Sequence, residues 1–125
     1  MNKFECTKWD ELAYAEATDN AKIGDAKMTF AYTGVVEGEG KSAALLIYTA
    51  DGSGTATGAE LFTGRINGRE GTVIFHTTNT FDAEGVTGTF TVVPGTGTGE
   101  LAGAGGSGAY EMKMGTMSTD YTFTS

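Results

Sequence analysis

TATGAELFTGRINGREG, residues 55–71, predicts a β-hairpin. Asn67-Gly68 is typical of a two-residue type I′ turn, because both positions need a positive φ that asparagine and glycine tolerate. This turn would pair Ile66 with Arg69 and so set the register of the two strands. Glu60 is the unexpected residue, since its charge lies among small and apolar residues. The register decides whether this carboxylate faces solvent or the interior.

Turn signals recur along the whole chain of 125 residues. The alternating or apolar runs between them predict an all-β protein of eight strands. The expected strands cover residues 3–16, 21–36, 42–50, 55–66, 69–81, 86–93, 106–114 and 117–124, with turns that include 18–20 and 37–41. For the first strand, a short helix from Trp9 is the alternative, because Asp10 and Glu11 suit a first helical turn. The short connections favour one antiparallel up-and-down barrel, a single domain over residues 1–125.

Composition and charge exclude several classes of function. The chain has 8 Lys+Arg and 16 Asp+Glu, a net charge of -8, which disfavours binding to nucleic acid or to an anionic membrane. It has no apolar run near the ~20 residues that span a bilayer, and its first residues lack the apolar core of a signal peptide. We therefore expect a cytoplasmic protein. The one cysteine, Cys6, excludes an intrachain disulfide, and we expect an inert thiol, no metal site and no cofactor.

The predicted turns also assign side chains to the two faces of the sheet. Asn67-Gly68 places Glu60 opposite Phe75, and a turn over 50–53 would pair Thr49 with Gly54. The face that carries Glu60 is then expected to hold Ala43, Leu45, Ile47, Phe62, Val73, Phe75, Thr77, Asn79, Phe81, Phe90 and Val92. This is the inner face, because it holds four phenylalanines and burial of each stabilises the fold by roughly 1.5–3 kcal/mol.

Glu60 is thus predicted to be an inward carboxylate. Such a group is costly unless paired, and burial raises its pKa toward the range of a general acid or base near neutral pH. Two structural alternatives remain: a buried glutamate satisfied by backbone or tyrosine groups, or one at a wet barrel mouth. Thr77 and Asn79 are candidates to orient a ligand, the alternative being bonds to backbone or water. Phe62, Phe75 and Phe90 would contact an apolar ligand.

The outer face carries an apolar row formed by Leu61, Ile74 and Val93, with Leu46 and Tyr48 expected nearby. Such a row favours a homo-oligomer that associates through this face; scattered surface residues are the alternative. His76 also falls on this face, and we interpret it as a solvated side chain without a metal.

The glycine-rich segment PGTGTGELAGAGGSG, residues 94–108, superficially suggests a phosphate-binding loop. No Lys-Ser/Thr follows it, and the chain lacks the parallel sheet of a dinucleotide-binding fold. We expect a tight crossing between strands, with Leu101 closing one end of the core.

Two long segments resemble a known family: DGSGTATGAELFTGRINGREGTVIFHTTNTFDAEG, residues 51–85, and FTVVPGTGTGELAGAGGSGAY, residues 90–110. They are similar to a bacterial domain family of unknown function with an allene-oxide-cyclase-like, calycin-type barrel. The resemblance implies an eight-stranded barrel with a central cavity. The wider relatives, allene oxide cyclases and plant dirigent proteins, act on hydrophobic small molecules, often as oligomers. The family's glutamate is retained as Glu60, whereas its frequent histidine is replaced by Thr77, so a Glu–His pair is missing.

Three functions follow, in order of preference. The first is binding of a small hydrophobic molecule inside the barrel. The second is an isomerase or cyclase with Glu60 as general acid or base and Asn79 as an orienting group. The third is a structural scaffold that assembles through the outer apolar row.

Overall fold

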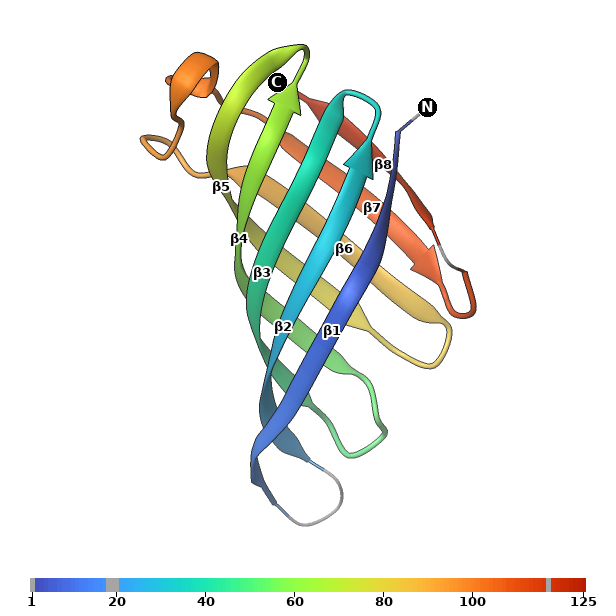
Figure 1. Cartoon of the computed structure of the whole chain (residues 1–125). Helices are drawn as coiled ribbons and strands as arrows, with labels where there is room; N and C mark the ends of the chain where they lie inside the picture. Colours follow the sequence, from blue (N-terminus) through green and yellow to red (C-terminus); the bar gives the residue numbers. More distant parts are fainter. Residues whose placement is uncertain (1, 18–20, 117) are drawn as a thin grey trace.

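Eight antiparallel strands follow one another around a closed up-and-down barrel, which confirms the predicted fold class (Figure 1). The computed structural model describes residues 2–17, 21–116 and 118–125, so the turn predicted at 18–20 lies outside the described residues. The strands are β1 (Lys3–Glu16), β2 (Lys22–Thr33), β3 (Val36–Tyr48), β4 (Gly54–Ile66), β5 (Arg69–Phe81), β6 (Gly85–Val92), β7 (Ser107–Lys113) and β8 (Thr119–Thr124). A single turn of 3₁₀ helix, η1 (Gly99–Leu101), lies between β6 and β7. The segment around Trp9 is a strand, as preferred over the helix.

The turn predicted at 37–41 is wrong. Chain reversal between β2 and β3 occurs at 34–35, where Gly34 has φ 105°, and residues 37–41 lie within β3. The glycines of this segment suggested a loop, but they alternate with the charged residues Glu37, Glu39 and Lys41 as a strand requires. Gly40 is buried and faces the interior.

The predicted inward positions Ala43, Leu45 and Ile47 on β3 are also wrong. The loop contains five residues, because the Thr49 N–H donates to the Ser53 carbonyl at 2.8 Å and Tyr48, not Thr49, pairs with Gly54. A shift of one residue sends every side chain of a strand to the opposite face. The inward residues of β3 are instead Ser42, Ala44, Leu46 and Tyr48.

The hairpin β4–β5 has the predicted register. Ile66 pairs with Arg69 and Glu60 with Phe75, and Asn67 takes the expected positive φ of 52°. The β5–β6 pairing is also as predicted, with Thr77 opposite Phe90. These strands therefore place Glu60 and Thr77 on one inner face.

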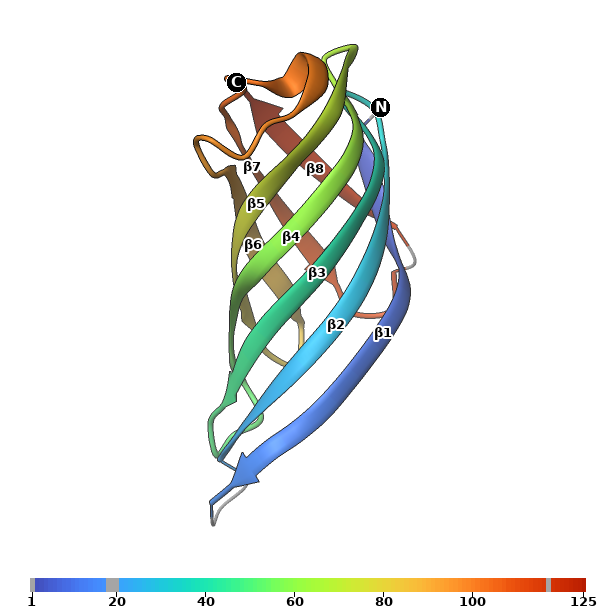
Figure 2. The same cartoon turned by 60° about the vertical axis from the view of Figure 1, so that its left-hand side comes forward.

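Large aromatic side chains fill one half of the barrel interior. This cluster comprises Phe4, Tyr32, Val36, Phe62, Ile66, Val73, Phe75, Phe90, Val92, Leu101 and Tyr121. Leu101 of η1 is 1% exposed and closes this end, as expected from the sequence (Figure 2, upper end). The Tyr121 hydroxyl accepts from the Val36 N–H and lies 2.8 and 2.9 Å from the carbonyl oxygens of Thr33 and Val36, to either of which its one proton can be donated. It therefore ties β8 to the β2–β3 turn.

Small side chains line the other half of the interior. Ala26, Ala44 and Ala56 form a second buried cluster with Leu46, and Met28, Tyr48 and Phe81 pack against it. Alanines cannot fill an eight-stranded barrel, which is wide enough for large side chains or a small ligand. Space therefore remains in this half.

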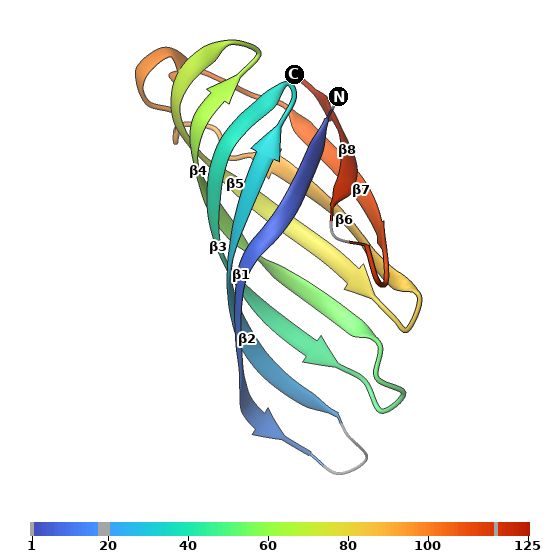
Figure 3. The ribbon, with the colours of Figure 1, turned by 45° about the vertical axis from the view of Figure 1, so that its right-hand side comes forward.

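The barrel closes along β1 and β8 over a short distance only. The two strands pair at Lys3–Asp120 and Phe4–Thr119. Beyond that point, β1 residues 5–16 are exposed, and the lower ends of β1 and β2 extend well past β6, β7 and β8 (Figures 1 and 3). Register shifts between Cys6 and Lys8 and between Ala13 and Ala15 interrupt this edge, a feature that hinders pairing with another strand. The interior is thus accessible from the side.

The outer face carries the predicted apolar row. Leu61 pairs with Ile74, and the Val93 N–H donates to the Ile74 carbonyl at 2.9 Å. Leu61 is 49% exposed, and Leu45 and Ile47 extend the apolar surface in place of Leu46 and Tyr48. None of the helical structure in the described part of the chain is long and apolar enough to cross a membrane.

Candidate functional site

A cavity of about 460 Å³ lies in the half of the barrel where Ala26 and Ala56 leave space. Its wall is mainly aromatic, methionine and alanine side chains, with a few polar groups among them. The lining residues are Phe4, Glu5, Cys6, Trp9, Ala26, Met28, Phe30, Tyr32, Ser42, Leu46, Tyr48, Ala56, Glu60, Thr77, Asn79, Phe81, Val86, Phe90, Tyr110, Met112, Met114, Thr116 and Thr119. Residues of β1 and of the β7–β8 side form its mouth, where the barrel seam is open.

Glu60 lies on the cavity wall and is 3% exposed. The Tyr32 hydroxyl donates to Glu60 Oε2 at 2.5 Å, a bond that joins β2 to β4 over Gly40 of β3. The Tyr32 ring is fixed in turn by edge-to-face contacts with Phe62 and Phe75, at centroid distances of 5.7 and 6.5 Å. The carboxyl group is therefore held in place by a partner that is itself packed.

Gly40 provides the space for this carboxyl group. A Cβ atom at position 40 would overlap Glu60 Oε2, so any other residue there would displace the glutamate. The φ of Gly40 is not in the left-handed region, so the glycine is required for room and not for backbone conformation. Gly40 and Glu60 form one structural unit across β3 and β4.

Burial raises the pKa of Glu60 to about 7, and the hydrogen bond from Tyr32 lowers it in part. Burial also raises the pKa of Tyr32 well above its ordinary value, and the charge of Glu60 adds to this effect. The phenol therefore stays protonated and acts as a donor. Glu60 can hold or release a proton near neutral pH, the condition that general acid–base chemistry requires.

A second polar pair joins β5 and β7. The Tyr110 hydroxyl donates to Asn79 Oδ1, and burial raises the pKa of Tyr110, with a further contribution from the charge of Glu60. A Cβ atom at Gly88 would overlap both Asn79 Oδ1 and the Tyr110 hydroxyl. Glycine thus makes room for this pair as Gly40 does for the first.

Two hydroxyl groups on the wall are available to a ligand. Ser42 and Thr77 are each 7% exposed, and neither hydroxyl has a hydrogen-bond partner among the described residues. Neither is a fully occluded unpaired atom, since the described residues contain no such atom. Both hydroxyls therefore reach the cavity space, close to Glu60 in the strand pairing.

The structure brings Glu60, Thr77, Asn79 and Phe90 together on the cavity wall. Phe62 and Phe75 are fully buried in the aromatic half of the barrel, where they support Tyr32 and do not line the cavity. His76 is exposed on the outer face, away from this site.

Tyr32, Tyr110 and Met28 line the cavity but were not predicted from the sequence. Tyr32 lies two residues before the β2–β3 turn. Because that turn was predicted in the wrong place, the pairing of β2 with β3, and therefore the direction of Tyr32, could not be derived. The clearest available signal was the glycine at position 40, because an inward glycine in a strand marks a close approach by another group.

The rim of the cavity mouth holds a further carboxylate, that of Glu11. Trp9 Nε1 donates to Glu11 Oε1 at 3.2 Å, and the Tyr48 hydroxyl donates to Glu11 Oε2. Lys22 Nζ lies 4.7 Å from the centroid of the Tyr48 ring. Trp9 is 53% exposed, so this cluster is a solvated rim and not part of the buried wall.

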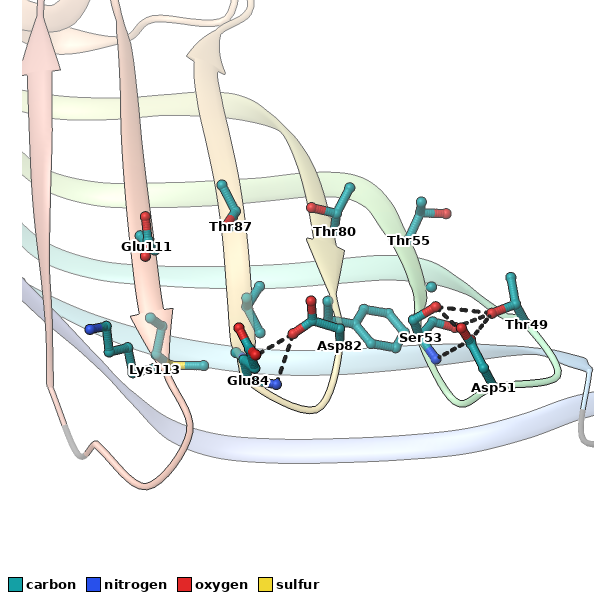
Figure 4. Close-up of a pocket in the computed structure, with 15 residues that line it drawn as sticks. Thr49, Asp51, Ser53, Thr55, Thr80, Asp82, Glu84, Thr87, Glu111 and Lys113 are labelled. Atoms are coloured by element: carbon teal, nitrogen blue, oxygen red, sulfur yellow. Dashed lines mark hydrogen bonds between the residues drawn. The ribbon is translucent and has the colours of Figure 1, made fainter.

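A larger groove of about 760 Å³ lies on the outer surface beside the β3–β4 and β5–β6 loops (Figure 4). Its two aspartates are used by their own loops: Asp51 accepts from Thr49 and Ser53, and Asp82 accepts from the N–H groups of Glu84 and Gly85. The hydrogen bonds from Thr49 and Ser53 lower the pKa of Asp51 to about 2. Most lining side chains are exposed, so we take the barrel cavity as the site.

The side chains of types that can ligate a metal ion are not clustered in the described residues. Across residues 2–17, 21–116 and 118–125, no group of three or more His, Cys, Asp or Glu side chains is placed to hold a metal ion.

Comparison with known proteins gives a family match without a function. The model of the family "Protein of unknown function (DUF3224)" matches residues 1–124. The fold is similar to the crystal structure of a DUF3224 protein of unknown function from Shewanella oneidensis MR-1. That protein is 21% identical, with a TM-score of 0.73 over 99% of this chain and 96% of the other. None of the curated proteins matches the chain.

Proposed function

Because the chain belongs to the DUF3224 family, whose function is unknown, we propose a function from the site itself: the barrel binds a small hydrophobic molecule in its cavity. The observation that carries this proposal is the space of about 460 Å³ beside the buried Glu60. Ligand pockets typically have volumes of roughly 300–1,000 Å³ and apolar walls with a few placed polar groups. The cavity has both properties.

The polar groups on the cavity wall are held in fixed positions, which supports a binding site over a core that is simply loosely packed. Glu60 and Asn79 are each held by a tyrosine hydroxyl, and glycines at 40 and 88 leave room for both pairs. A polar group fixed in position costs less entropy to use on binding. Met28 of β2 and Met112 of β7, both on the wall, can adapt to the shape of an apolar ligand.

Calorimetric titration with 1-naphthylmethanol, a neutral apolar probe, tests the proposal. The wild type should bind, and Ala56→Phe, which fills the cavity, should not. Ala59→Phe is the matched control, because Ala59 is exposed on the outer face of the same strand, whereas Ala56 is 9% exposed and lines the cavity. Equal binding by the two variants, or none by the wild type, would reject the barrel cavity as the site.

A second candidate function is proton transfer in an isomerase or cyclase, favoured by the Glu60 pKa of about 7. In this reaction the Glu60 carboxylate would take a proton from the carbon next to a substrate carbonyl and later return it. Asn79 would orient the carbonyl. Thr77 occupies the position at which the family that the sequence resembles often has a histidine. Glu60 would therefore act without an imidazole partner.

Exchange of the α-protons of 2-tetralone with D₂O, followed by NMR, tests this candidate. The wild type should accelerate exchange over buffer, and Glu60→Gln should abolish the acceleration while its spectrum stays that of the folded protein. Exchange that is equally fast with both proteins would argue against Glu60 as the base.

A further inference from the structure

The ionisable side chains that line the cavity can carry only negative charge. Its ionisable groups are acids, phenols and a thiol: Glu5 and Cys6 on β1, Tyr32 on β2, Tyr48 on β3, Glu60 on β4 and Tyr110 on β7. No lysine, arginine or histidine is among the described residues that line it. When Glu60 ionises, no protein cation on the wall can pair with it.

Glu60 also has hydrogen-bonding capacity to spare. Tyr32 donates to Oε2, and no second donor to the carboxyl group occurs among the described residues. An ionised carboxylate has about four acceptor sites on its two oxygens. A buried charge with one hydrogen bond and no counter-ion is costly, and a bound cation would relieve that cost.

Aromatic rings surround the space next to the carboxyl group. Tyr32 touches Phe4 and Phe90 at centroid distances of 5.6 and 6.3 Å, and Phe4 lies 4.9 Å from Tyr110; all four rings line the cavity. Ring faces attract cations within about 6 Å, more strongly when water is excluded. Carboxylate and rings together suit an ammonium group attached to an apolar body.

We propose that the cavity is selective for an apolar molecule that carries a protonated amine, with the ammonium group on Glu60 and the apolar body against Phe90 and Met28. This inference rests on the proposed binding function and specifies its ligand class. The ammonium donates to the free oxygen of Glu60, and the Thr77 and Ser42 hydroxyls accept its remaining protons. The carboxylate retains its bond from Tyr32.

Calorimetric titration of three matched probes tests the ligand class: 1-naphthylmethylamine, 1-naphthylmethanol and 1-naphthoic acid, at pH 8. The wild type should bind the amine at least about tenfold more tightly than the alcohol, as expected for a buried charge-assisted hydrogen bond, and the acid least. Glu60→Gln should bind the amine and the alcohol alike. Its fold is checked by its NMR spectrum.

Glu11→Gln is the control for a charge effect at the mouth. Glu11 is also a carboxylate bonded to a tyrosine hydroxyl, but it lies at the rim and does not line the cavity. This variant should keep the preference for the amine. Loss of the preference in Glu11→Gln but not in Glu60→Gln would overturn the proposal, as would an alcohol bound as tightly as the amine by the wild type. Failure of all three probes would instead reject the binding function itself.

Discussion

At the scale of single residues, the fold keeps the Glu60 carboxyl group in an apolar interior with one hydrogen-bond donor and with a glycine that leaves room for it. Tyr32 supplies the donor and Gly40 supplies the space. The inward position of Glu60 could be predicted because the Asn67-Gly68 turn sets the register of its hairpin. Its partners could not, because both belong to strands whose turn was predicted in the wrong place.

Glu60 should make the stability of the protein depend on pH. Its pKa rises from an ordinary 4.5 to about 7 in the folded state, so the native protein holds a proton that the unfolded chain has released between these values. The contribution of the protonated Glu60 to the free energy of unfolding is therefore fully present below pH 4.5 and is lost as pH rises to about 7. The free energy of unfolding should fall by about 3 kcal/mol more for the wild type than for Glu60→Gln over this range. Urea denaturation of both proteins measures this difference; parallel curves would contradict a raised pKa.

Gly40 and Glu60 should be energetically coupled. Gly40→Ala should cost about 1–3 kcal/mol of unfolding free energy in the wild type, because its Cβ overlaps the carboxyl group. In a Glu60→Ala background the same change should cost much less. A double-mutant cycle by chemical denaturation measures the coupling. Gly105→Ala is the neutral control, since a Cβ there meets no atom within 4 Å. Additive costs would mean that the two residues do not share the space.

At the scale of elements, tight turns determined which predictions succeeded. The β4–β5 register was predicted correctly, because the two-residue turn Asn67-Gly68 leaves no freedom of register. The β5–β6 register was also correct, with Phe81 opposite Val86 across the loop 82–85. The β3–β4 loop misled prediction, since Asp51 organises Thr49 and Ser53 into a five-residue loop that no local pattern distinguishes from a four-residue one. The error reversed the faces of β3 and hid Ser42 and Leu46 from the predicted interior.

Cysteine labelling tests the register of β3. In a Cys6→Ser background, Ala43→Cys should react quickly with a maleimide and Ala44→Cys slowly, because Ala43 is exposed and Ala44 is 5% exposed. Mass spectrometry of the labelled protein gives both rates. The reverse order would restore the register in which Ala43 points inward.

At the scale of the whole molecule, the barrel divides into a filled half and a hollow half. The aromatic cluster and Leu101 close one end, while alanines and the short β1–β8 contact leave the other open. Composition and turn spacing were enough to predict the barrel. They could not predict the division, because it depends on which alanines of β2, β3 and β4 face one another.

The outer apolar row makes self-association a further prediction. Leu61 is 49% exposed and lies beside Ile74 and Val93. Light scattering should give the wild type a mass above that of the monomer, and Leu61→Lys should lower it to the monomer. A monomeric wild type at micromolar concentration would contradict an interface on this face.

Methyl NMR of the methionines tests the central claim, that the cavity binds apolar molecules, most directly. Met28, Met112 and Met114 all line the cavity. On titration with 1-naphthylmethanol, their methyl signals should shift together and saturate at one ligand per chain. Unchanged signals for these three methionines at concentrations where calorimetry detects binding would place the ligand elsewhere and contradict the account.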